Sequence, residues 1–152
     1  MRKLFVFVLV FSATVCVAET KLPKKVNNVL SSMYAGAKNV EWTFSEEDYQ
    51  VTFQHEGADK IAVISKVGVW KQTSTVLTEE MMPVCISDAI ANMYMSVEIA
   101  ETLLIEMPKT SVYQVTVDVS IEEYDEDKDE DIVKIERVTK KFDKDCSLLE
   151  EE

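Results

Sequence analysis

The sequence predicts an α+β fold of two tandem helix-plus-antiparallel-sheet repeats, with the helices on one face of the sheet. Three matches within the chain predict it. Two amphipathic helix patterns lie sixty residues apart, and the strand pattern Tyr49–Phe53 recurs as Tyr113–Val117. More loosely, Ile64–Trp70 corresponds to Phe142–Leu148. Three matches in the same order indicate one supersecondary unit used twice.

The first eighteen residues have the pattern of a signal peptide. A basic start, an apolar stretch over Leu4–Val15 and small residues at Cys16 and Ala18 predict cleavage before Glu19. The apolar stretch is shorter than the roughly 20 residues that span a bilayer. Two alternatives remain, an N-terminal membrane anchor and a lipoprotein lipidated at Cys16. The mature chain is expected in the periplasm or outside the cell.

Composition narrows the classes of partner. The chain has 28 acidic and 16 basic residues, and two of the basic ones lie in the signal peptide, so the mature net charge is −14. Such a chain repels phosphate backbones and anionic lipid headgroups, so nucleic acid is not an expected partner. Beyond the signal peptide no segment is long and apolar enough to predict a membrane span.

Each predicted repeat begins with a helix. Pro23–Tyr34 and Pro83–Tyr94 both start at a proline, where its missing N–H costs nothing. Apolar residues then follow at the i, i+3, i+4 and i+7 spacing of a helix with one buried stripe. The expected boundaries are therefore 19–78 for the first repeat and 79–152 for the second.

Three antiparallel strands and a short apolar tail are expected after each helix. The expected strands are Lys38–Phe44, Asp48–His55, Lys60–Ser65, Val97–Glu106, Ser111–Ile121 and Ile132–Phe142. In the last strand the apolar residues change phase, with Val133 and Ile135 on odd positions but Val138 and Phe142 on even ones. A β-bulge near Glu136-Arg137 would bring them onto one face.

The strands alternate apolar and polar residues, so one face of the sheet is expected to bury against the helices. The opposite face is expected to be open, polar and gently concave, and therefore able to receive another protein. The candidate partner face consists of Gln50, Thr52, Gln54, Gln114, Thr116 and Asp118. The alternative is an ordinary solvated surface.

Short motifs in both halves carry a resemblance to a known family. They are Leu22-Pro23, Tyr34–Lys38, Trp42, Tyr49–Phe53, Gly68–Trp70, Met82-Pro83, Met93-Tyr94, Tyr113–Val115 and Phe142–Asp145. The pattern resembles the PepSY-like domains of β-lactamase-inhibitor-protein-like architecture, found in exported proteins of Bacteroidota. The resemblance implies an open antiparallel sheet backed by helices, in a group that includes an enzyme inhibitor.

The resemblance transfers no binding residue, and the chain departs from it at three positions. Ala35 and Met95 replace the proline that follows the helix, and Cys146 replaces the glycine of the last turn. A left-handed backbone at Cys146 would cost more than at glycine. Cys146 and Cys85 are the two cysteines of the mature chain, and they are either a disulfide pair in an oxidising compartment or two separate buried thiols.

Enzymatic chemistry finds no support in the sequence. The single histidine, His55, lies at a strand end in phase with apolar residues, and no glycine-rich elbow accompanies a serine. No cofactor or metal site is predicted. The acidic segment 122–131 alternates aspartates as a calcium loop does, but lacks the loop's glycine and final glutamate. A solvated hairpin tip is the other interpretation.

The sequence therefore predicts an exported, non-enzymatic binding module. The expected mode is protein binding, in inhibitor-like fashion, through the open face of the sheet. The alternative is a periplasmic protein that binds a small molecule or calcium.

Overall fold

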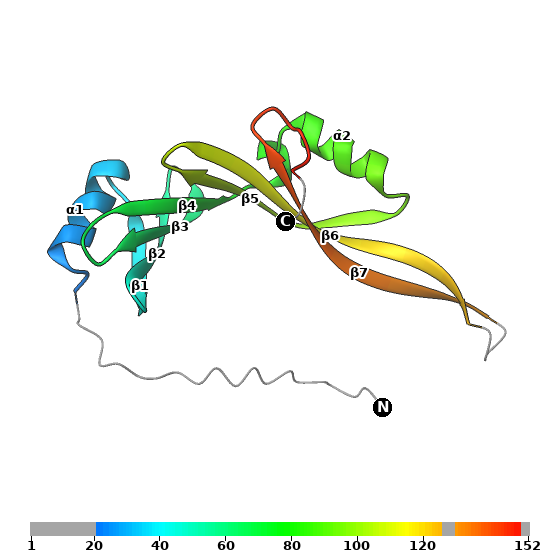
Figure 1. Cartoon of the computed structure of the whole chain (residues 1–152), viewed down its shortest axis with the longest axis horizontal. Coiled ribbons are helices and arrows are strands. Elements are labelled where there is room, and N and C mark those ends of the chain that lie inside the picture. Colours follow the sequence, from blue (N-terminus) through cyan, green and yellow to red (C-terminus); the bar gives the residue numbers. More distant parts are fainter. Residues whose placement is uncertain (1–20, 126–129, 150–152) are drawn as a thin grey trace.

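The computed structural model describes residues 21–125 and 130–149 as two α-helices, one 3₁₀ helix and seven strands. The helices are α1 (Lys24–Met33), η1 (Glu79–Met81) and α2 (Val84–Met93). The strands are β1 (Lys38–Ser45), β2 (Asp48–His55), β3 (Ala58–Ser65), β4 (Trp70–Val76), β5 (Val97–Met107), β6 (Thr110–Asp125) and β7 (Glu130–Asp143). All seven strands form one antiparallel sheet in chain order (Figure 1).

Both helices lie where the apolar spacing predicts them. Each follows directly after its proline, and each buries two residues one turn apart, Val26 and Leu30 in α1 and Ile86 and Ile90 in α2. Neither helix has a side-chain cap at its start. Packing against the sheet, rather than capping, therefore holds these ten-residue helices.

The prediction of two tandem helix-plus-sheet repeats is wrong, because the sheet is single and continuous. After the predicted strand Lys60–Ser65 only a short apolar tail is expected, but the chain there forms the complete strand β4, Trp70–Val76. It pairs with β3 on one side and, through Thr73–Val76, with Leu103–Glu106 of β5 on the other. The backbone of β4 thus joins strands that the sequence pattern assigned to separate units.

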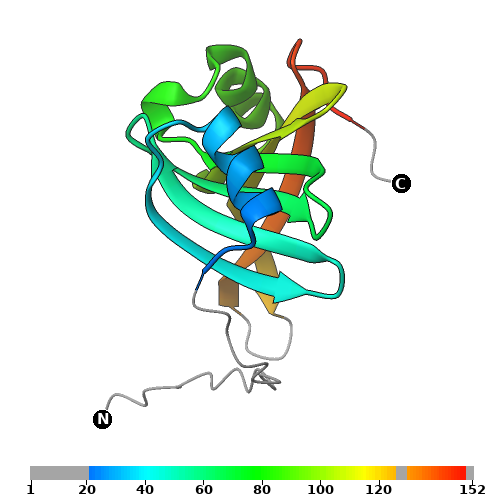
Figure 2. The ribbon, with the colours of Figure 1, turned by 90° about the vertical axis from the view of Figure 1, so that its left-hand side faces the viewer.

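One row of cross-strand partners shows that both helices pack on the same face. The row runs Phe53, Lys60, Thr75, Leu104, Tyr113, Phe142 across β2 to β7. Its first member packs in the core beneath α1, and its last packs beneath α2. Directly opposed residues in neighbouring strands point to the same side. Figure 2 shows α1 lying across the strands of the first half.

The apolar core on that face divides into two clusters. Val26 and Leu30 pack on β2 and β3, over Val51, Phe53, Ala62 and Ile64. Met82, Ile86 and Ile90 pack on β6 and β7, over Val115, Val117, Val119 and Phe142. Between the clusters, the buried residues of the central strands are threonines, namely Thr73, Thr75 and Thr102. The sheet is continuous, but its core is not.

The turn that ends β3 and the turn that ends β7 have the same hydrogen bonds. The N–H of Ser65 donates to the carbonyl of Val69 at 2.8 Å, and that of Asp143 donates to Ser147 at 2.9 Å. Gly68 and Cys146 occupy the same place, with φ angles of 86° and 64°. The left-handed backbone expected to be costly at Cys146 is therefore present there.

No bulge interrupts the pairing of β6 with β7. The register is regular from Val112 opposite Asp143 to Asp125 opposite Glu130. The predicted bulge near Glu136-Arg137 is wrong, and the change of phase is real. Val138 lies against the core of α2, whereas Ile135 and Val133 point to the opposite side of the sheet.

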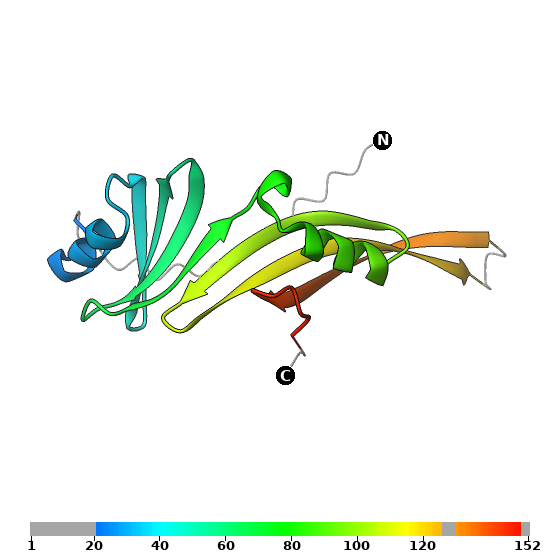
Figure 3. The same ribbon diagram turned by 90° about the horizontal axis from the view of Figure 1, so that it is seen from above.

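The sheet bends along its length into an arch (Figure 1). The first half, with α1 on its outside, turns down at one end, and the hairpin of β6 and β7 extends down at the other. Both helices lie on the outer side of this arch. The uncovered face of the sheet is therefore the inner, concave one (Figures 1 and 3).

Candidate functional site: the bare face of the sheet

We call the side of the sheet opposite α1 and α2 the bare face. It consists of the residues that alternate with the core positions along each strand. One row across it runs Glu41, Thr52, Ile61, Ser74, Ile105, Val112 from β1 to β6. Within the described residues no helix packs on this face.

All six candidate residues lie on the bare face, but they form two groups. Gln50, Thr52 and Gln54 belong to β2 and are exposed. Gln114, Thr116 and Asp118 belong to β6 and are half-buried. Strands β3, β4 and β5 lie between the two groups. The prediction that these residues form a partner site is not tested by this arrangement, which fixes only their positions.

The group on β2 is held by side-chain hydrogen bonds at its outer end. The side chain of Asn39 donates to Oε1 of Gln54 at 2.8 Å, and Nε2 of Gln54 donates to Asp59 at 2.9 Å. These bonds link β1, β2 and β3 across the bare face. Gln54 therefore has a fixed orientation, whereas no hydrogen bond is recorded for the side chains of Gln50 and Thr52.

The group on β6 includes a two-point ion pair with β7. Nε and Nη2 of Arg137 donate to the two carboxylate oxygens of Asp118, both at 2.7 Å. The hydrogen bonds from Arg137, aided by its charge, hold the pKa of the Asp118 carboxyl below its usual value. Thr116 is hydrogen-bonded to Thr139 at 3.2 Å. The pair and the threonines cross-link β6 to β7.

Between the two polar groups lies an apolar strip that the sequence analysis missed. Its members share the bare face of the central strands and are Ile61, Val63, Val76, Leu103, Ile105 and Val112. Five are half-buried, and Val76 is 40% exposed. The expectation of a wholly polar open face is therefore wrong at its centre. The polar residues form its margins.

A signal for this strip exists in the sequence. In β3 the run Ile61–Ile64 and in β5 the run Leu103–Ile105 are apolar on consecutive positions, not on alternate ones. Because successive side chains of a strand point to opposite faces, a run of consecutive apolar residues places apolar side chains on both faces of the sheet. The alternating strands β2 and β6 dominated the prediction, and they happen to carry the polar margins.

The hairpin of β6 and β7 extends the apolar surface beyond the rest of the sheet. Val133 and Ile135 are 66% and 70% exposed on the bare face, and Tyr124 is 54% exposed on the same side. We call these three residues the arm patch. Single exposed apolar residues are common on soluble proteins, but adjacent ones on a face with an apolar centre are typical of an interaction surface.

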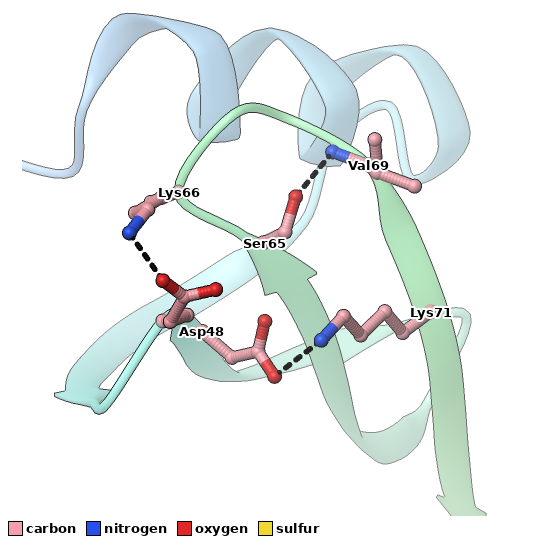
Figure 4. A network of polar contacts seen from close by, with 6 residues as sticks. Asp48, Ser65, Lys66, Val69 and Lys71 are labelled. Atoms are coloured by element: carbon pink, nitrogen blue, oxygen red, sulfur yellow. Dashed lines mark hydrogen bonds and ion pairs between the residues drawn. The ribbon is translucent and has the colours of Figure 1, made fainter.

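Ion pairs border the bare face at the turn end of the first half (Figure 4). Nζ of Lys71 lies 2.7 Å from Oδ2 of Asp48, and Nζ of Lys66 lies 2.6 Å from Oε1 of Glu47. The hydroxyl of Ser65 accepts a hydrogen bond from the N–H of Val69 at 3.0 Å. These contacts join the β1–β2 turn and the start of β2 to the β3–β4 connection and the start of β4.

His55 lies at the end of β2 on the helix-covered face, next to aromatic residues. Its ring is 5.5 Å from that of Tyr34, in an edge-on arrangement, and Nδ1 is 3.8 Å from the carboxylate of Glu56. These contacts are structural packing at the edge of the first core cluster.

The two cysteines of the described residues lie together at the start of α2 and in the turn after β7. Cys85 and Cys146 form a disulfide with their Cα atoms 6.0 Å apart, a separation within the usual range for such bonds. The bond joins the first turn of α2 to the turn after β7. It lies outside the bare face and has no direct place in the candidate site.

Within the acidic segment 122–131, residues 126–129 lie outside the described residues, and so do the side chains of residues 125, 130 and 131. The structure describes the side chains of Glu122, Glu123 and Tyr124, but not those of the aspartates at 125, 127, 129 and 131. The calcium prediction for this segment therefore stays a prediction. Among the described residues no three His, Cys, Asp or Glu side chains are grouped to hold a metal ion.

The described helices are all too short or too polar to cross a membrane. Comparison of the sequence with protein-family models gives no match, and comparison with curated proteins gives none. The fold, in contrast, has clear counterparts among solved structures.

Those counterparts come from Bacteroides species. A BLIP-like protein from Bacteroides fragilis is 19% identical, with a TM-score of 0.69 over 88% of each chain. A DUF2874 family protein from Bacteroides uniformis is 19% identical, with a TM-score of 0.68 over 86% of this chain and 88% of the other. A Bacteroides eggerthii protein, provisionally assigned to the periplasm, is 16% identical, with a TM-score of 0.67 over 86% and 87%.

At these identities the likeness establishes the fold alone. This chain has the BLIP-like architecture that the motifs in its sequence implied.

Proposed function

We propose that this protein is an exported, non-enzymatic binding module that docks another protein against its bare face. The observation that supports the proposal is the apolar strip, which lies on the concave side of the sheet where none of the described helices covers it. Buried apolar area at the centre of an interface, with polar residues around it, is the usual anatomy of a protein-binding site.

Export is part of the proposal. The signal-peptide pattern over residues 1–18, the disulfide and the provisional periplasmic assignment of the Bacteroides eggerthii protein support it. The proposed partner is accordingly an envelope or extracellular protein. Membership of the PepSY-like group rests on the motifs in the sequence and is proposed on that basis.

The charges on the bare face indicate what kind of partner surface would be complementary to it. Acidic residues on the bare face outnumber basic ones; Glu41, Asp48, Asp59, Glu98, Glu101, Asp118, Glu122 and Asp143 lie there, against Lys38, Arg137 and Lys141. A partner with an apolar centre and a basic margin would be complementary, and opposite charges would speed its association.

The experiment compares capture of envelope proteins by the mature chain and by variants of the two faces. Ile105→Arg places a charge in the apolar strip, and Ser31→Arg places the same charge on the exposed outer side of α1. Circular dichroism confirms that both variants are folded. We expect Ile105→Arg to lose a partner that the parent and Ser31→Arg retain.

The opposite result has a clear meaning. If every protein captured by the parent is captured equally by Ile105→Arg and by Val133→Arg, neither the strip nor the arm patch contributes to binding. The bare face is then only a solvated surface, and the proposal fails.

A further inference from the structure

Strand β5 has an open edge in the middle of the sheet. Its second half, Leu103–Glu106, pairs with β4, and the N–H of Leu77 donates to the carbonyl of Thr102 at 2.9 Å. The chain then leaves the sheet through η1. The first half of β5 pairs with β6 on one side and has no strand of the described chain on the other (Figure 3).

The open edge is a hollow in the surface. A cavity of about 540 Å³ lies along it, lined by Leu77, Glu79 and residues 97–102. This size is typical of ligand sites. Ile99 is 36% exposed there, and a register shift at Ala100 displaces the strand locally. We call this hollow the β5 notch.

The backbone at the notch can accept another strand. A strand edge without a neighbour presents N–H and C=O groups that pair readily with an extended segment. Residues 97–101 extend over about 17 Å at roughly 3.3 Å per residue. An added segment of about five residues would continue the line of β4 along β5.

Charge restricts what can bind. Glu79, Glu98 and Glu101 are exposed around the notch, and no lysine or arginine is among the described residues that line it. Charged residues at an edge prevent pairing with strands of like charge. A second copy of this chain, with its mature charge of −14, is disfavoured, whereas a basic segment is attracted.

We propose that the β5 notch binds an extended, basic peptide segment by strand addition. The backbone groups of residues 97–101 supply the main-chain hydrogen bonds, as in other cases of strand addition. Glu98 and Glu101, on the bare-face side of the strand, select lysine or arginine side chains. This second site adjoins the bare face and shares Glu98 and Glu101 with it, but its main-chain groups lie at the strand edge and not on the face.

The test uses a synthetic peptide with alternating Lys and Val over six residues, added to the isotopically labelled mature protein. NMR amide chemical shifts report where it binds. We expect shifts concentrated at residues 97–102 and at Leu77. A peptide with proline in place of its third residue loses a donor and should bind at least about tenfold more weakly. A peptide of alternating Glu and Val should not bind.

Two double variants separate the notch from general electrostatics. Glu98→Lys with Glu101→Lys should weaken binding of the Lys–Val peptide by about tenfold or more. Glu46→Lys with Glu56→Lys makes the same charge change in the turns of the first half, and should weaken binding by less than about threefold. Both are checked for folding by circular dichroism.

Two results would overturn the inference. Equal affinities of the Lys–Val and proline peptides would exclude strand addition. Shifts that spread over the bare face instead of residues 97–102 would exclude the notch. Thr52→Arg, on the bare face in β2, should leave binding of the peptide unchanged, so the notch can fail while the proposed function stands, or the reverse.

Discussion

Buried polar residues of the central strands form hydrogen bonds in the region between the two core clusters. Thr73, fully buried in β4, is the clearest case. Its Oγ1 accepts hydrogen bonds from the hydroxyl of Tyr34 at 2.8 Å and from Nε1 of Trp70 at 2.9 Å. Burial raises the pKa of the Tyr34 hydroxyl, and the hydrogen bond to Thr73 partly opposes that rise. One hydroxyl thus anchors the end of α1 to the sheet.

Replacement of Thr73 by valine tests this anchor. The variant keeps the shape but leaves the donors of Tyr34 and Trp70 without an acceptor, so the free energy of unfolding should fall by about 1–3 kcal/mol. Thr43→Val, on an exposed position of β1, should change it by less than about 0.5 kcal/mol. Urea unfolding measures both. Equal stability of Thr73→Val and the parent would show that the hydroxyl of Tyr34 and the indole N–H of Trp70 find other hydrogen-bond acceptors.

The Asp118–Arg137 pair predicts a pH effect. Because the folded-state pKa of Asp118 is lowered, the pair contributes stability above the unfolded carboxyl pKa and loses it as the pH falls through the folded value. Arg137→Gln should raise the pKa of Asp118 towards its ordinary value. Carboxyl NMR titration measures the shift directly. An unchanged Asp118 pKa in Arg137→Gln would mean that the pair does not form in solution.

At the scale of elements, the sequence predicted most of what is local. The two helices, strand β2 and five further strands lie within a few residues of their predicted bounds, because apolar periodicity reflects burial on one face. Strand β4 was missed because its buried positions are threonines, which give no apolar signal. Because β4 was missed, the connection between the two halves of the sheet was missed too, since it depends on pairing between residues that are distant in sequence.

The candidate site was predictable only in part, for a related reason. The polar residues of β2 and β6 do lie on the bare face, since alternation assigns faces well within one strand. The apolar strip depends on β3 and β5, whose apolar runs do not reveal which side is covered. In strand β7, the assumption that all apolar residues share one buried face led to the prediction of a β-bulge, and the structure has none there.

The arm patch gives a prediction for the hairpin of β6 and β7. Val133→Thr with Ile135→Thr should change the free energy of unfolding by less than about 0.5 kcal/mol, because both side chains are exposed. Val117→Thr, which buries a hydroxyl in the core of α2, should cost about 1–3 kcal/mol. A large loss in the double variant would mean that the arm residues are buried in solution and that the regular register is wrong.

At the scale of the whole molecule, one sheet carries two separate cores. The disulfide belongs to only one of them, because Cys85 lies in the first turn of α2 and Cys146 follows β7. The sequence separation of 61 residues encloses α2 and β5 to β7. Closing a loop of that length restricts the unfolded chain, and typically stabilises the folded one by about 2–4 kcal/mol.

Cys85→Ser with Cys146→Ser should therefore destabilise the two halves unequally. Hydrogen exchange, read by mass spectrometry, should show faster exchange in α2 and β5 to β7, with α1 and β1 to β3 little changed. Reduction of the parent should reproduce the pattern, and reduction of the variant should add nothing. Uniform acceleration over both halves would show that the sheet unfolds as a single cooperative unit.

The four residue pairs between β4 and β5 are the shortest ladder in the sheet, and the only one that joins the two halves. Neither core cluster spans it. A substitution that weakens the β4–β5 pairing would therefore loosen the connection between the two halves while leaving the packing within each core cluster in place.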